Sequence, residues 1–326
     1  MSRFGLSTIN YLNYKKEAFM NENNVAVIDV GTLKSKFEIR QYDKSMNSKV
    51  LFRDKKLTVM GRDLDKNGNM ILDESVNLVI EALNEFKNKM SEHQVKRYRA
   101  VTTDAIRRAA NAKEVLDRIE DATGIRLETL SHEDEARMIF QSISVDFPDK
   151  LIAVADIGGG SVQVVIGKNE EILELHLFKT GAYYLQQNFS KTHHPTKREL
   201  DNTAQFIKGE LISLGESKYK SELLVYGTSN IIDFMKAMDI EMKKNVSSIS
   251  HPYSVDVEVL RPVYNKIVAL SYEERMPLFP AEPYYMWSAE NALLNVFQIC
   301  ESLKIKRVVP SNNNISSAIL YELASI

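Results

Sequence analysis

Two stretches of the chain share one pattern of apolar and polar positions. In each stretch an apolar run leads into an Asp-x-Gly turn, after which apolar and polar residues alternate: NNVAVIDVGTLKSKFEIRQYD, which starts at residue 23, and DKLIAVADIGGGSVQVVIGKN, which starts at residue 149. Short apolar runs bounded by turn residues predict buried strands, so each stretch predicts a β-hairpin. Because the pattern recurs so far along the chain, we expect one fold used twice.

The rest of the chain mixes strand and helix patterns. Thr103 or Asp104 is a suitable N-cap for a helix that ends at Gly124, which is a suitable C-cap. The other expected elements are a strand over 49–61, helices over 75–90, 197–214 and 231–239, a strand over 222–230 and a largely helical end. This order predicts a mixed α/β protein with hairpin-rich sheets rather than a strict alternation of strand and helix.

Composition narrows the class of protein. The chain has 326 residues, enough for two ordinary domains, and its 44% hydrophobic and 26% charged content is typical of a globular protein. A net charge of -2 argues against nucleic acid or an anionic membrane as a partner. Cys300 is the single cysteine, which excludes an internal disulfide and fits the cytoplasm. We find neither a secretory leader nor the ~20 consecutive apolar residues of a membrane span.

The two Asp-x-Gly turns carry the candidate chemistry. Glycines at Gly31 and at 158–160 would let backbone N–H groups approach a phosphate closely. Asp29 and Asp156 precede these glycines, and a carboxylate there could hold Mg²⁺, which takes few protein carboxylates and keeps water. The plainer interpretation is that each aspartate only accepts N–H bonds within its own turn.

Several motifs in one order resemble a known family. They are DVGTLKS, TTDAIRRAAN, LSHEDEARMIF, DIGGGSVQ, KTGAYYLQQNF and YGTSNI, spread over residues 25 to 324. Together they are similar to the exopolyphosphatase and guanosine pentaphosphate phosphohydrolase (Ppx/GppA) family, within the actin, sugar kinase and chaperone superfamily. The resemblance implies an α/β fold of two ribonuclease-H-like domains with an active site in the interdomain cleft.

The resemblance also implies a role for each matching residue. Asp29 and Asp156 would hold Mg²⁺, Arg107 would clamp phosphate oxygens, and Glu135 would activate a water molecule, with Asp134 as the alternative base. The implied phosphate-binding residues are Gly31, Thr32, Gly158, Gly159, Gly160, Ser161, Gly227 and Thr228.

The sequence departs from the family pattern at several motif positions. These are Thr32–Lys34 in place of Ser-Asn-Ser, His132 in place of glycine, Asp134 in place of glutamate, Gln163 in place of a carboxylate, Tyr226 in place of glycine and Pro283 in place of arginine. Gln163 matters most, because an amide offers a hard cation one neutral oxygen where a carboxylate offers anionic ones. We therefore expect slow or no hydrolysis with ligand binding retained, and a gain of Mg²⁺-dependent turnover in Gln163→Glu.

Two motifs also have purely structural interpretations. The acids of SHEDEAR could simply favour a helix start that Ser131 caps, which is compatible with catalysis. The loop from Asp63 to Glu74 satisfies the EF-hand calcium pattern, but the strand-like residues before it and the absence of a second such loop predict an ordinary polar turn.

These observations lead to one functional hypothesis and two alternatives. The leading hypothesis is a Mg²⁺-dependent phosphohydrolase that removes terminal phosphate from polyphosphate or guanosine pentaphosphate. The alternatives are a weak or inactive family member that binds polyphosphate or a guanosine alarmone as a sensor and, less favoured, an actin-like ATPase or kinase. We expect an amphipathic N-terminal extension over 1–24 and domains over 25–148 and 149–326; a homodimer is compatible with the sequence.

Overall fold

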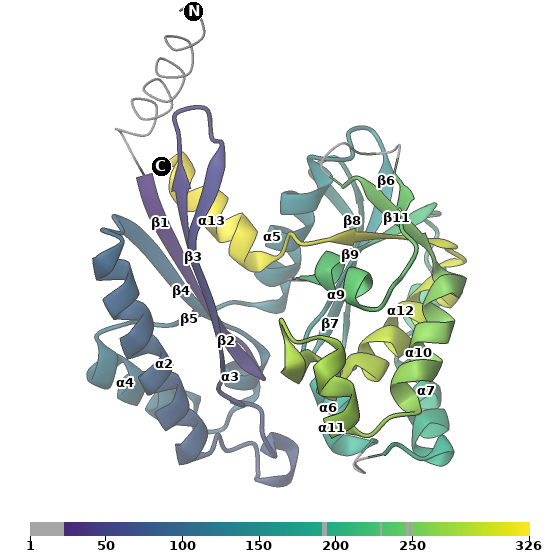
Figure 1. Cartoon of the computed structure of the whole chain (residues 1–326), viewed down its shortest axis with the longest axis horizontal. Coiled ribbons are helices and arrows are strands. Elements are labelled where there is room, and N and C mark those ends of the chain that lie inside the picture. The colour runs from purple at the N-terminus through teal and green to yellow at the C-terminus, as the bar shows by residue number, and fades with distance from the viewer. Residues whose placement is uncertain (1–22, 191–193, 229, 246–247, 249–250) are drawn as a thin grey trace, which may run out of the picture.

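The computed structural model describes residues 23–190, 194–228, 230–245, 248 and 251–326. It contains two sheets that repeat one strand order (Figure 1). The first sheet has the order β3 (Ser48–Leu57), β2 (Lys34–Tyr42), β1 (Asn23–Val30), β4 (Arg97–Thr102), β5 (Glu128–Thr129). Taken in the same direction, the second has the order β8 (Glu171–Phe178), β7 (Val162–Lys168), β6 (Leu151–Ile157), β9 (Leu223–Gly227), β12 (Arg307–Ser311), and continues with β11 (Tyr253–Asp256) and β10 (Lys243–Lys244).

The repeat is visible in the strand directions as well. In the first sheet β1 pairs antiparallel with β2 and parallel with β4. In the second, β6 pairs antiparallel with β7 and parallel with β9. The two Asp-x-Gly hairpins are therefore the central strands of two equivalent sheets, which confirms the expected α/β fold of two ribonuclease-H-like domains.

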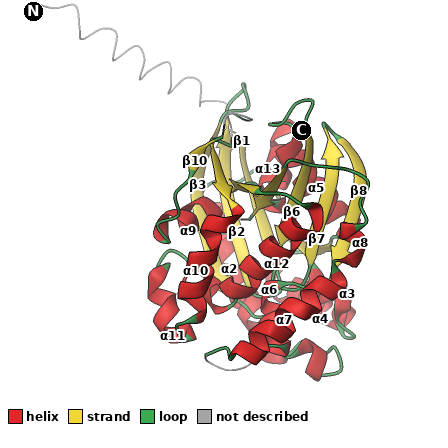
Figure 2. Ribbon diagram, turned by 90° about the vertical axis from the view of Figure 1, so that its right-hand side faces the viewer, coloured by secondary structure: helices red, strands yellow, loops and turns green. Residues whose placement is uncertain are grey.

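The helices form layers outside and between the sheets. They are α2 (Asp73–Glu92), α3 (Asp104–Arg108), α4 (Ala112–Thr123), α5 (His132–Ser144), α6 (Ala182–Asn188), α7 (Lys197–Glu210), α8 (Ile212–Gly215), α9 (Ile231–Ala237), α10 (Leu260–Val268), α11 (Tyr272–Arg275), α12 (Ala289–Leu303) and α13 (Ile315–Ser325). Helices α2 and α4 cover the outer face of the first sheet, where Phe37 of β2 stacks on Phe86 of α2. Helices α7 and α12 contribute to the hydrophobic core on the outer face of the second sheet (Figure 2).

Local sequence accounts for many helix ends. Ser131 accepts a hydrogen bond from the Asp134 backbone N–H at the start of α5, and Thr196 forms a capping box with Glu199 at the start of α7. Gly124 ends α4 in the left-handed conformation, as its sequence position predicts. The expected single helix from residue 103 to Gly124 is instead two helices, because Asn111 bonds both backbone groups of Ile71 and interrupts the helix there.

Helices α5 and α13 lie between the two sheets and cover the sheet of the opposite half. Helix α5 buries Ile139 and Phe140 against β6 and β7, whereas the C-terminal α13 buries Ile319 against β1 and β4. All strands of the first sheet precede residue 149 and all strands of the second follow it. Helices α5 and α13, however, each pack against the sheet on the other side of this boundary. The boundaries 25–148 and 149–326 stay predictions for units that fold independently.

Two further expectations concern the ends and surface of the chain. Most of the N-terminal extension expected over 1–24 lies outside the described residues, and β1 already begins at Asn23. Within the part of the chain that the structure describes, no helix is both long and apolar enough to cross a bilayer.

Candidate active site

The two glycine turns face each other across one pocket between the sheets. Each turn is closed by the same hydrogen bond, from Gly31 N to Lys34 O and from Gly158 N to Ser161 O, both 3.0 Å. A Cβ atom on Gly159 would lie only 3.5 Å from the Cβ of Thr32, so the tips of the two turns touch. The sequence repeat therefore builds two loops that are closed in the same way and line one space.

Gly160 is required by its close neighbours. A Cβ atom at this position would stand 1.9 Å from a carboxylate oxygen of Asp104 and 2.9 Å from the Thr32 hydroxyl. The backbone of Gly160 is also covered by Gly181, whose own Cβ would lie 2.2 Å from the Gly160 carbonyl carbon. Any side chain here would push the two turns apart.

Four carboxylates line this pocket, which encloses about 80 Å³. Asp29 and Asp156 are the next-to-last residues of β1 and β6. Glu135 is in the first turn of α5, and Asp104 is the first residue of α3. The other lining residues are Gly31, Thr32, Lys36, Thr103, Ile157, Gly158, Gly159, Gly160, Ser161, Thr228 and Ile315. The expected convergence of Asp29, Asp156 and Glu135 on one cleft is thus what the structure shows.

Glu135 is buried, and Arg107 holds its carboxyl group in place. Only 6% of Glu135 is exposed, and its Oε2 accepts a 2.8 Å hydrogen bond from Nη1 of Arg107. Burial raises the pKa of Glu135 to about 8; Arg107 opposes this shift, whereas Asp156 and Asp29 add to it. A carboxyl with such a pKa is a stronger base than an ordinary glutamate once it is ionised, and it becomes ionised as the pH passes about 8.

Arg107 and Asp134 lie differently from their expected places. Arg107 is absent from the pocket lining, and its Nη1 bonds the Leu130 carbonyl as well as Glu135, so in this structure it orients the carboxyl instead of reaching the pocket. Asp134 is exposed and accepts a 2.8 Å hydrogen bond from the Ser131 hydroxyl in the helix cap. Of the two adjacent acids, the geometry favours Glu135 as the base.

Asp29 and Asp156 differ in their electrostatic surroundings. Lys36 lies opposite Asp29 in the β1–β2 register and donates to Asp29 Oδ2 at 3.0 Å. Burial raises the pKa of Asp156 to about 6, with Lys36 opposing the shift and Asp29 adding to it. For Lys36, burial lowers the pKa, but the carboxylates of Asp29 and Asp156 outweigh it and the net shift is upward. The pocket therefore carries an excess of negative charge.

The donor set fits Mg²⁺ held by few protein ligands. Among the described residues there is no group of three or more acidic, histidine or cysteine side chains close enough to cage a metal ion. Mg²⁺ is commonly held by one or two carboxylates, with waters and substrate phosphates completing its shell. Asp29 and Asp156 in one acidic pocket match that arrangement, and a divalent cation would offset the charge that otherwise repels phosphate.

Gln163 supports Ser161 from beneath the pocket. Gln163 is 1% exposed, lies beside Asp156 in the β6–β7 register and donates from Nε2 to Ser161 Oγ at 3.0 Å. Since Ser161 Oγ accepts this bond, its own proton is left to be donated elsewhere, and Ser161 lines the pocket. The amide thus orients a hydroxyl group of the pocket lining, a contact that its sequence position alone did not reveal.

In the later glycine-containing loop, Thr228 lines the pocket and Gly227 does not. Thr228 lines the pocket, and its backbone N–H donates to Ser311 O at 3.1 Å. Gly227 is buried at the end of β9, where a Cβ atom would meet Asn313 O and a methyl group of Ile143 at 3.1 Å. Of the expected phosphate-binding residues, only Gly227 lies outside the pocket lining.

Three charged residues in or beside the pocket were not expected from the sequence. Asp104 looked like a helix cap, yet it is 4% exposed and bonds Arg108 at 3.2 Å inside the pocket wall. Lys36 could have been found from its alternation with Lys34 on one face of β2. Glu282 carried no local signal, because its partners come from β2, β3 and the start of α9.

The loop with the EF-hand pattern is an ordinary turn. The element directly before it is a strand, β3, which ends at Leu57, and within the loop a 3-10 turn covers Leu64–Lys66 before α2. Its acids already have cationic partners, since Asp63 pairs with Lys66, and Asp65 pairs with Arg108 and Lys179. This agrees with the polar-turn interpretation.

Comparison with known proteins shows which proteins this chain resembles. The model of the Ppx/GppA phosphatase family matches residues 39–325. The guanosine-5'-triphosphate,3'-diphosphate pyrophosphatase of Photobacterium profundum is 23% identical over 265 residues, which cover 79% of this chain and 51% of that protein. The bifunctional 3-dehydroquinate synthase/phosphatase of Fusobacterium nucleatum is 22% identical over 59% of this chain and 31% of its own. The chain spans about half or less of these relatives.

Solved structures share the fold over nearly the whole chain. An exopolyphosphatase from Cytophaga hutchinsonii superimposes with a TM-score of 0.81 at 20% identity, covering 93% of this chain and 98% of its own. The Ppx/GppA family member of Aquifex aeolicus gives 0.73 at 22% identity, with the same coverage of 93% and 98%. With the family pattern running through 39–325 and the paired glycine turns in place, this chain belongs to the Ppx/GppA phosphatase family.

Proposed function

We propose that this chain hydrolyses the terminal phosphoanhydride bond of inorganic polyphosphate or of guanosine pentaphosphate. The observation that carries the proposal is Glu135, a buried carboxyl with a raised pKa that faces the two glycine turns across one pocket. The named activities of the Photobacterium and Cytophaga relatives support this substrate class.

The residues of the chain have distinct tasks in this mechanism. The N–H groups of the two turns and the hydroxyls of Thr32 and Ser161 bind the terminal phosphoryl oxygens. Asp29 and Asp156 would hold Mg²⁺, which supplies positive charge to the phosphate oxygens when bound. Glu135 takes the proton of the attacking water, and Arg107 keeps the carboxyl in position.

A catalytically weak binding protein is the second candidate. Gln163 favours it, because the family carboxylate at this position is replaced by an amide that donates to Ser161 and has only a neutral oxygen to offer a metal ion. Such a protein would keep the phosphate pocket and act as a sensor. A cytoplasmic location and a homodimer stay predictions.

The first test incubates the purified chain and Mg²⁺ with polyphosphate, guanosine pentaphosphate or ATP in separate reactions. Phosphate release and ligand binding are measured side by side. Release from either of the first two ligands supports hydrolysis, binding without release supports the sensor, and release from ATP alone contradicts both.

The second test replaces Glu135 by glutamine, which keeps an oxygen for Arg107 to bond. We expect phosphate release to fall by roughly 10²–10⁴-fold with binding nearly unchanged, because only the proton acceptor is lost. The wild-type rate should rise as the pH passes about 8, the value to which the pKa of Glu135 is raised.

Glu133→Gln is the matched control, since Glu133 is an exposed acid in the same helical turn. Full activity in Glu135→Gln together with loss of activity in Asp134→Asn would move the base to Asp134 and refute the assignment.

A further inference from the structure

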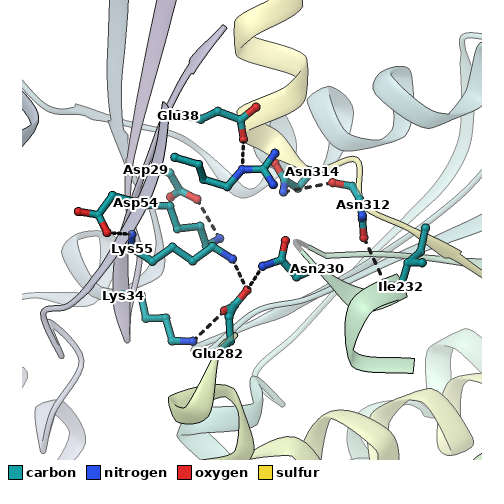
Figure 3. Close-up of polar contacts among 12 residues, drawn as sticks. Asp29, Lys34, Glu38, Asp54, Lys55, Asn230, Ile232, Glu282, Asn312 and Asn314 are labelled. Carbon is teal, nitrogen blue, oxygen red and sulfur yellow. Dashed lines mark hydrogen bonds and ion pairs between the residues drawn. The ribbon is translucent and has the colours of Figure 1, made fainter. Parts of the chain in front are cut away.

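A second cluster of charges joins the two halves of the molecule beside the phosphate pocket. Glu282, from the second half, accepts hydrogen bonds from Nζ of Lys34 at 3.0 Å, from Nζ of Lys55, and from Nδ2 of Asn230 at 2.6 Å (Figure 3). Lys34 and Lys55 lie on β2 and β3 of the first sheet. We call these four residues the Glu282 cluster.

The Glu282 cluster is largely shielded from solvent and carries a net positive charge. The side chains of Lys34, Lys55 and Glu282 are 12%, 16% and 8% exposed. Two lysines face one glutamate, so a single carboxylate balances only half of their charge. Since Asn230 adds an amide donor, the cluster presents three donors to one anionic group, as a phosphate-binding site does.

The Glu282 cluster lies directly next to the place of the terminal phosphate. A compartment lined by Lys34, Glu282, Tyr285 and Ser288 shares its other wall with the phosphate pocket. The shared wall consists of Gly31, Thr32, Lys36, Ile157, Gly158, Gly159 and Thr228. A chain whose end occupied the pocket would therefore bring its next phosphoryl group toward Lys34 and the Glu282 carboxylate. Lys55 and Asn230 line a neighbouring cavity and bond the other oxygen of that carboxylate.

We propose that Lys34, Lys55 and Asn230 form the binding site for the second phosphoryl group of the substrate, and that Glu282 occupies this site in the ligand-free protein. This inference rests on the proposed function. The glutamate carboxylate and the phosphoryl group compete for the same donors, so Glu282 weakens the binding of every ligand that carries at least two linked phosphates. A single phosphate needs only the glycine turns, so Glu282 does not compete with its binding.

The test compares Glu282→Gln with the wild type in calorimetric titrations with tripolyphosphate and with orthophosphate. We expect Kd for tripolyphosphate to fall about tenfold, because charge-assisted donors are released, while Kd for orthophosphate changes less than about twofold. The titrations are made at pH 6.5, because burial lowers the pKa of Lys55 to about 8 even with Glu282 present.

Asp65→Asn is the matched control. Asp65 also links the two halves, through Lys179 at 3.2 Å, but it lies outside the phosphate pocket and the compartment beside it. If Glu282→Gln acted only by loosening the two halves, Asp65→Asn would tighten tripolyphosphate binding equally, which would refute the proposal. Adding Lys55→Met to Glu282→Gln should abolish the gain.

An unchanged Kd for tripolyphosphate in Glu282→Gln, or an equal gain for orthophosphate, would also refute the proposal. Should Glu282→Gln not fold, Glu282→Asp, which shortens the reach of the carboxylate, should give a smaller gain of the same sign, and no gain there would count against the site. Binding is measured without turnover, so a wild type that releases no phosphate would refute the proposed hydrolysis and leave this comparison valid.

Discussion

At the scale of single residues, the pocket contains a carboxyl group, that of Asp156, whose negative charge destabilises the folded protein. An aspartate carboxyl ordinarily titrates near 3.8, whereas burial raises the pKa of Asp156 to about 6. Between these values the folded chain binds more protons than the unfolded chain, so the free energy of unfolding falls as the pH rises through this window. Above about pH 6 the loss is complete.

Replacing Asp156 by asparagine should therefore stabilise the protein at neutral pH. We expect the Tm of Asp156→Asn to exceed that of the wild type by a few degrees at pH 7.5, and the difference to shrink toward pH 4. Thermal unfolding followed by circular dichroism measures this. Asp121→Asn, at an exposed site on α4, should show no such dependence; a difference that persists at pH 4 would contradict the explanation.

Gln163 offers a second prediction at this scale. In Gln163→Glu the carboxylate accepts the Ser161 proton that the amide leaves free, while it adds an anionic oxygen beside Asp156. We expect half-maximal activity at a lower Mg²⁺ concentration but a KM for substrate several-fold higher, since a charge-assisted hydrogen bond to phosphate is lost.

Kinetics over a range of Mg²⁺ concentrations separate the two effects. Ser161→Ala should raise KM in the same way without changing the Mg²⁺ dependence, because it removes the hydroxyl and adds no carboxylate. Robust wild-type hydrolysis that Gln163→Glu leaves unaltered would show that this position does not control turnover.

At the scale of elements, local sequence predicted what depends on neighbours along the chain. The two hairpins, the left-handed Gly124 and the glycine turns all follow from runs of a few residues. The break after α3 could not be predicted, since Asn111 bonds Ile71, which is 40 residues away. The places of Asp104 and Glu282 could not be predicted for the same reason, because Asp104 packs against the distant Gly160 and Glu282 pairs with lysines of β2 and β3.

At the scale of the whole molecule, helix α13 ties the C-terminus to the first sheet. Ile319 of α13 is fully buried with Val25, Val27 and Val101, whereas Tyr321 on the same helix is 58% exposed. We expect Ile319→Ala to lower the free energy of unfolding by roughly 2–5 kcal/mol, because a buried side chain leaves a cavity, and Tyr321→Ala to have little effect.

Hydrogen exchange should locate the damage in β1 and β4, at the other end of the sequence from the substitution. Loss of protection confined to α13, with β1 unaffected, would show that the helix is not required by the first sheet.

The exchange of α5 and α13 between the halves also bears on how the protein is made. On the ribosome, strands β1 to β5 of the first sheet emerge early, yet the 11 residues of α13 that cover one of its faces are synthesised only after the whole second sheet. Contacts between such distant segments slow folding, and the apolar face stays exposed until α13 has been synthesised. The nascent chain is therefore a natural client for a chaperone until α13 has emerged and covers the first sheet.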